Sequence, residues 1–103
     1  MARVGLVSPD LLFGSKVEGM LRAAGHEVVH GAEGVDAVVV DLTQGEIPPP
    51  PEGVPALGFY SHVEQDVRQA AEAAGYDMVV PRSRMNREGP ALVERLLARG
   101  QTH

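Results

Sequence analysis

Short apolar runs alternate with amphipathic segments along the chain. Five runs have the length and the β-branched content of strands: 3–7, 26–30, 37–42, 54–60 and 78–80. Three other segments repeat apolar residues at helical spacing: 8–25, 61–75 and about 90–99. Strands that alternate with helices predict a parallel sheet that is covered by helices on its faces.

Two connections between the predicted strands are unusual for such a sheet. The second and third strands are joined by about six residues, 31–36, although a parallel crossover commonly takes a dozen or more. Six extended residues reach about 20 Å, so the link is possible but taut, and a helix does not fit in it. We therefore predict four or five strands and leave open whether the second strand joins the sheet in the usual order.

The connection after the third strand contains four consecutive prolines, 48–51, where a helix is expected. Such a run favours an extended polyproline II conformation. It also contains a P-x-x-P pattern, which groove-binding domains recognise. A rigid crossover is the simpler interpretation of the same residues.

Composition narrows the class of protein. The length of 103 residues predicts one domain, 1–103, and the absence of cysteine excludes disulfides and thiolate metal sites. We see neither a signal peptide nor an apolar stretch of the roughly 18 residues that span a membrane, so we expect a cytoplasmic protein without a membrane partner. The net charge of −5 argues against nucleic acid as the main partner.

With this layout the chain resembles the receiver domain of response regulators, the fold of the chemotaxis response regulator. The similarity is carried by VVVDL in the third strand, by VPALGFYSHVE and AAEAAG across the fourth strand and its helix, and by MVVPRS at the fifth strand. The resemblance implies a flavodoxin-like three-layer α/β sandwich with strand order 2-1-3-4-5. Here the sandwich is truncated, because two of the crossover helices are missing or minimal.

The resemblance also assigns positions in the receiver active site. The phosphoacceptor of receivers falls on Asp41, and their strand-five lysine falls on Arg82. Their hydroxyl residue at the end of strand four falls on Tyr60. Ser61 comes one place later and has the spacing of a helix cap with Glu64.

The acid pair that holds magnesium in receivers falls on Ser8 and Pro9, and Asp10 lies one place late. Phosphoryl transfer to a carboxylate needs charge neutralisation, commonly by Mg²⁺, and Mg²⁺ needs several oxygen ligands in octahedral geometry. A hydroxyl and a proline are poor substitutes for two carboxylates. We therefore expect no metal, no cofactor and no catalytic residue, and we predict that Asp41 is the counter-ion of Arg82.

Two classes of function remain. The first is a non-catalytic pseudo-receiver that binds a protein partner or itself, such as a homodimer. The face that loses two helices would expose apolar strands, so either the proline segment lies across it or another chain does. The alternative is a phosphoacceptor, or a sensor of a small phosphate-bearing ligand, at the carboxyl ends of the strands. In the sensor, Arg82, Ser8 and Ser61 would bind the anion beside Asp41.

Overall fold

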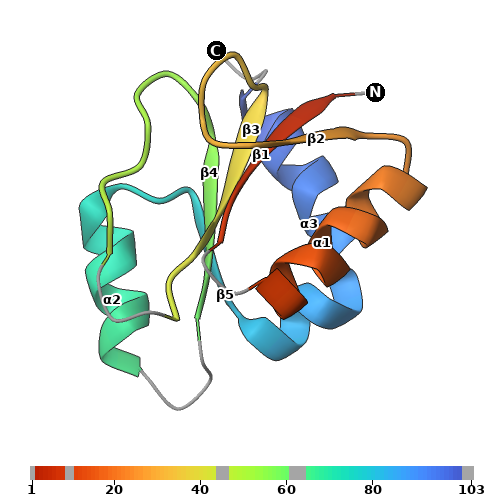
Figure 1. Cartoon of the computed structure of the whole chain (residues 1–103). Coiled ribbons are helices and arrows are strands. Elements are labelled where there is room, and N and C mark those ends of the chain that lie inside the picture. The colour runs from red at the N-terminus through yellow and green to blue at the C-terminus, as the bar shows by residue number, and fades with distance from the viewer. Residues whose placement is uncertain (1, 9–10, 44–46, 61–64, 101–103) are drawn as a thin grey trace.

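The structure is a computed structural model that describes residues 2–8, 11–43, 47–60 and 65–100. Its strands are all parallel and form one sheet in the order β2-β1-β3-β4-β5 (Figure 1). The strands are β1 (Arg3–Val7), β2 (Glu27–His30), β3 (Ala37–Asp41), β4 (Ala56–Tyr60) and β5 (Met78–Pro81). The described helices are α1 (Leu11–Ala23), α2 (Gln65–Ala74) and α3 (Arg82–Gly100). The predicted flavodoxin-like, truncated α/β fold is confirmed.

The two faces of the sheet are covered differently. Helices α1 and α3 pack on one face, and α2 packs on the other (Figure 1). Alternation along the strands divides the core accordingly, since Val39 belongs to the cluster under α1 and α3 whereas Val38 and Val40 belong to the cluster on the α2 side. Helix α1 contributes Phe13, Val17 and Leu21, which recur every four residues and are all buried.

Strand β2 does join the sheet, which removes the doubt raised by the short link 31–36. It pairs in parallel with β1, with Arg3 opposite Glu27 and Leu6 opposite His30. The link crosses β1 on the α2 side directly over Gly5, where a β-carbon would lie 2.1 Å from the carbonyl oxygen of Gly31. A taut crossover is possible because the strand beneath it has no side chain at this position.

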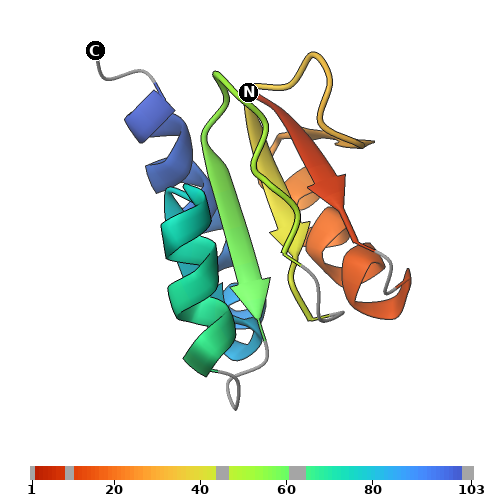
Figure 2. The ribbon, with the colours of Figure 1, turned by 90° about the vertical axis from the view of Figure 1, so that its left-hand side faces the viewer.

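The sequence leaves open whether the proline segment or another chain covers the α2 face, and in the structure the proline-rich connection lies on it. Val38, Val40 and Leu42 are at most 3% exposed. Ala32 of the short link and Ile47 of the proline-rich connection pack against the same cluster. Figure 2 looks onto this side and shows the connection running along the sheet beside α2. The short link and the proline-rich connection therefore help to cover the face from which two helices are missing.

The last helix begins earlier than the sequence pattern indicates. Helix α3 starts at Arg82, directly after β5, and places Met85 in the core. It is kinked at Glu88, whose φ of −125° and ψ of 16° are not helical. Pro90 explains the kink, because its ring cannot follow a regular helical turn. The predicted segment 90–99 is the part of α3 beyond this kink.

The ends of the strands define two edges of the sheet. The carboxyl edge contains the ends of β1, β3, β4 and β5, and the amino edge contains their starts. Figure 2 shows the arrows of β1, β3 and β4 pointing towards the carboxyl edge. Among the described helices, none has the length and apolarity needed to cross a membrane.

Candidate functional site at the carboxyl edge

Asp41 is the buried acid of the carboxyl edge. It ends β3 and is only 5% exposed. Its Oδ2 atom accepts a hydrogen bond from Ser8 Oγ at 3.0 Å. Its Oδ1 atom accepts hydrogen bonds from the backbone N–H of Thr43 at 2.8 Å and from the Thr43 hydroxyl. Both carboxylate oxygens therefore have neutral hydrogen-bond donors, which satisfy a group whose burial would otherwise be costly.

The local sequence explains this arrangement. Strand β3 pairs with β1, and Val40 lies opposite Val7, so that Asp41 and Ser8 are the next residues on the two strands. An aspartate commonly accepts a hydrogen bond from the backbone two residues later, and Thr43 is in that position. Asp41 thus closes the end of its strand and connects it to the end of β1.

Arg82 is the first residue of α3 and lies elsewhere on this edge. The carbon of its guanidinium group is 4.3 Å from the centre of the Phe13 ring, in a cation–π contact. The Phe13 ring in turn contacts the Phe59 ring, with 5.1 Å between the ring centres. These contacts join α3, α1 and β4 at the carboxyl edge of the sheet.

The predicted ion pair between Asp41 and Arg82 is wrong: no such pair is formed in this part of the structure, in which both side chains are described. Strand β4 separates β3 from β5, so the two residues start from strands about 10 Å apart. Asp41 is satisfied by Ser8 and Thr43, and the guanidinium group of Arg82 packs on the Phe13 ring.

The structure brings together only some of the site residues predicted from the sequence. Ser8 and Asp41 are in contact, as described above. Tyr60 is buried with the cluster on the α2 side, whereas alternation places Asp41 with Val39 towards the other face. Ser61 lies outside the described residues, as do Pro9, Asp10 and the cap partner Glu64.

Two contributors to this edge were not predicted as site residues. Thr43 has a recognisable signal, because a Thr two residues after a strand-ending Asp is typical of a side-chain-to-backbone turn. Phe13 has none, since a phenylalanine in an apolar helix stripe indicates only core packing. Within the predicted helix 8–25, the structure buries Phe13 and leaves its neighbour Leu12 87% exposed.

The donor set around Asp41 bears on metal binding. Within the described residues, no group of three or more histidine, cysteine or acidic side chains is arranged to hold a metal ion. At the Asp41 position the neighbouring oxygens belong to the hydroxyl groups of Ser8 and Thr43. One carboxylate with two hydroxyls is a weak ligand set for Mg²⁺, which is bound mainly by carboxylates, phosphates and water.

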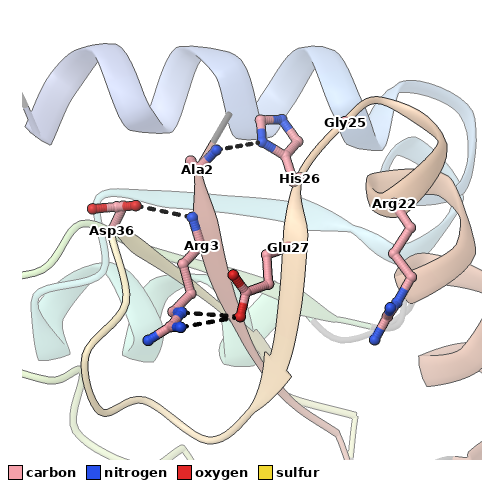
Figure 3. Close-up of a pocket in the computed structure, with 7 residues that line it drawn as sticks. All are labelled: Ala2, Arg3, Arg22, Gly25, His26, Glu27 and Asp36. Carbon is pink, nitrogen blue, oxygen red and sulfur yellow. Dashed lines mark hydrogen bonds and ion pairs between the residues drawn. The ribbon is translucent and has the colours of Figure 1, made fainter.

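A shallow pocket of about 660 Å³ lies at the opposite, amino edge (Figure 3). Its charged groups are largely paired with one another: Arg3 pairs with Glu27 at 3.1 Å, and Asp36 accepts a hydrogen bond from the backbone of Arg3. His26 Nδ1 accepts a hydrogen bond from the backbone of Ala2 at 3.3 Å. These contacts connect the starts of β1 and β2.

The other ring nitrogen of His26 points away from this pocket towards α3. His26 Nε2 lies 2.7 Å from Glu94 Oε2, at an angle outside that of a regular hydrogen bond. The ring therefore connects the amino edge to α3, and we interpret it as a structural group.

Three solved structures with the same fold are distant from this chain in sequence. NtrX from Brucella abortus, crystallised in complex with ADP, is 16% identical with a TM-score of 0.82, and the match covers 97% of this chain and 28% of that one. A CheY-like receiver domain protein from Methanospirillum hungatei is 13% identical with a TM-score of 0.77, and the match covers 98% and 97% of the two chains. The receiver domain of Francisella response regulator 1452 is 11% identical with a TM-score of 0.78, covering 96% and 98%.

These similarities establish the fold as that of response-regulator receiver domains. The chain spans 28% of the length of NtrX but nearly the full length of the isolated receivers. No family model matches the sequence, and no curated protein matches it. The activity of the chain must therefore be argued from its own residues.

Proposed function

We propose that the chain, taken as one receiver-like domain 1–103, is a non-catalytic pseudo-receiver that signals in the cytoplasm by binding another protein. The observation that carries the proposal is the hydrogen bond from Ser8 Oγ to Asp41 Oδ2. At the position where the resemblance expects a metal-holding acid, a neutral hydroxyl donates to the carboxylate. The carboxylate is thereby used to connect β1 to β3.

The position of Arg82 supports the same proposal. In the resemblance it replaces the lysine of strand five, which would approach the phosphoryl group. Here its guanidinium group lies over the Phe13 ring and helps to fix α3 against α1. Tyr60, in place of the hydroxyl residue of strand four, is only 3% exposed and packs on the α2 side. Arg82 and Tyr60 therefore have packing roles that do not require phosphorylation.

Exposed apolar side chains are the basis on which we propose a surface for the partner. Among the described residues, the exposed large apolar side chains are Val7 at 37% and Leu12 at 87%. Val7 ends β1 and Leu12 lies in the first turn of α1, so both flank Ser8 in the sequence. We propose that this corner binds a protein and that a second copy of the chain is the first partner to test, because a two-fold axis would use the same surface twice.

The test of the first proposal is treatment with acetyl phosphate, or with beryllofluoride, in the presence of Mg²⁺. We expect no added phosphoryl group by mass spectrometry and no beryllofluoride-dependent shift of the Asp41 and Thr43 amide signals. A phosphoryl adduct that disappears in Asp41→Asn would establish the alternative, a phosphoacceptor. Shifts caused by inorganic phosphate alone, and lost in Arg82→Ala, would establish the sensor of small anions.

Self-association is tested separately by light scattering over a range of protein concentrations. We expect a dimer that dissociates in Leu12→Asp, and Ala23→Asp, at an exposed position in the last turn of the same helix, is the matched control. A monomer at all concentrations would exclude the second copy as partner and would leave the interpretation of the Asp41 site unchanged.

A further inference from the structure

The proline-rich connection has one backbone conformation. Residues 47–50 each precede a proline, which restricts them to extended or polyproline II geometry, and the prolines fix their own φ. No cis peptide bond occurs in the described chain. The segment 47–51, named the proline ridge here, is therefore an all-trans polyproline II helix with about three residues per turn.

Threefold geometry gives the ridge three edges, one of which faces the protein. Ile47 and Pro50 are three residues apart and share that inner edge. Ile47 packs on the core cluster of the α2 side. The Pro50 ring lies against Gly75, where an added β-carbon would be 3.6 Å from Pro50 Cγ. The inner edge alone thus supplies the packing that replaces a helix.

The other two edges face solvent. Pro48 and Pro51 share one of them, and Pro49 lies on the other. Pro48, Pro49 and Glu52 are exposed and Pro51 is partly exposed. The hydroxyl of Tyr76 donates to the carbonyl of Pro48 at 2.8 Å, which fixes the start of the ridge. No described residue donates a hydrogen bond to the carbonyls of Pro49 and Pro50.

We propose that the two outer edges of the proline ridge are a docking site for a protein domain with an aromatic-lined polyproline groove. Such grooves bind the two solvent edges of a polyproline II helix and gain affinity because the helix is already ordered. Here the order is imposed by Tyr76 and by the inner edge. Packing requires Ile47 and Pro50 and gives no reason for exposed prolines at positions 48 and 49.

Charge narrows the partner further. Glu52 follows the ridge directly, at the start of a turn, and is exposed. The described part of the structure contains no ion pair of Glu52 with a basic side chain. A groove with lysine or arginine at its rim therefore fits this surface better than a neutral or acidic one. The proposal is independent of the carboxyl edge and of whether Asp41 is phosphorylated.

The experiment is an NMR titration of the ¹⁵N-labelled full chain. The probes are an SH3 domain and a WW domain, each with a basic residue beside its aromatic groove. We expect saturable shifts of the Glu52 and Gly53 amides with at least one probe. Pro48→Ala/Pro51→Ala should weaken binding by about tenfold or more, a loss typical of groove anchors. Pro55→Ala, outside the ridge, is the matched control and should bind normally.

Thermal melts of each variant separate binding from folding, because the Pro48 carbonyl that Tyr76 needs is kept in alanine. If the double variant does not fold, Glu52→Lys replaces it and should weaken binding without affecting the fold. The proposal is overturned if neither probe shifts Glu52 and Gly53. It is also overturned if a folded Pro48→Ala/Pro51→Ala variant binds as well as the unmodified chain. If this double variant does not fold, the same outcome for Glu52→Lys overturns the proposal.

Discussion

Ser8 Oγ lies 3.0 Å from Asp41 Oδ2 and donates a hydrogen bond to it between the ends of β1 and β3. Removing the Ser8 hydroxyl leaves Oδ2 of Asp41 without a hydrogen-bond donor among the described residues. The cost is high because Asp41 is only 5% exposed. We expect Ser8→Ala to lower the free energy of unfolding by about 1–3 kcal/mol, the range for a lost hydrogen bond to a buried charged group.

Urea denaturation measures this loss, and Ser15→Ala is its control. Ser15 is exposed on α1, and its substitution should change the free energy of unfolding by less than about 0.5 kcal/mol. Equal effects of the two substitutions would show that the contact between Ser8 and Asp41 does not stabilise the fold.

A second prediction concerns the crossing of the short link over β1. The β-carbon of Gly5→Ala would lie 2.1 Å from the carbonyl oxygen of Gly31, which is backbone and cannot rotate away. We expect a loss of at least about 1–3 kcal/mol in the free energy of unfolding, as for other overpacked positions. Gly19→Ala on α1 meets no atom within 4 Å and should stabilise by about 0.5–1 kcal/mol. A stable Gly5→Ala variant would mean that the link can move off the strand.

The sequence predicts the strands and helices better than it predicts which segments cover the faces of the sheet. Periodicity indicates five strands and the helix stripes because alternation and helical spacing follow directly from burial. It misses the first turns of α3, since Pro90 suggests a helix start whereas the helix already begins at Arg82 and continues through the kink at Glu88. It leaves open whether the proline segment or another chain covers the α2 face, because Ile47 carries no signal of the strand on which it packs.

The site is predicted less well than the fold. The resemblance places Asp41 and Ser8 near each other, and strand pairing confirms their contact. Arg82 is the first residue of α3, and the direction of its side chain decides what it contacts. The spacing of residues in the sequence does not predict that direction. The contact between Arg82 and Phe13 therefore had to come from the structure.

A third prediction uses Tyr76, which fixes the proline ridge. Tyr76→Phe removes the hydrogen bond to the Pro48 carbonyl and should cost about 1 kcal/mol. Burial raises the pKa of Tyr76 above its usual value of 10.0. Because the folded pKa is the higher one, the stabilisation is fully present below about pH 10 and is lost as the pH rises through the folded pKa.

Urea denaturation between pH 8 and the alkaline limit of folding would therefore show a steeper loss of stability in the unmodified chain than in Tyr76→Phe. Identical pH profiles of the two proteins would contradict the assignment of a buried, neutral Tyr76.

The last prediction restores an acid beside Asp41. Ser8→Asp replaces a hydroxyl donor at 3.0 Å with a second carboxylate, so like charges should repel and lower the melting temperature in EDTA. Two carboxylates are also a better ligand set for Mg²⁺, and bound metal stabilises the folded state. We therefore expect Mg²⁺ to raise the melting temperature of Ser8→Asp, but not that of the unmodified chain or of Ser8→Asn. An equal rise in all three proteins would show that Mg²⁺ already binds without this acid, against the pseudo-receiver proposal.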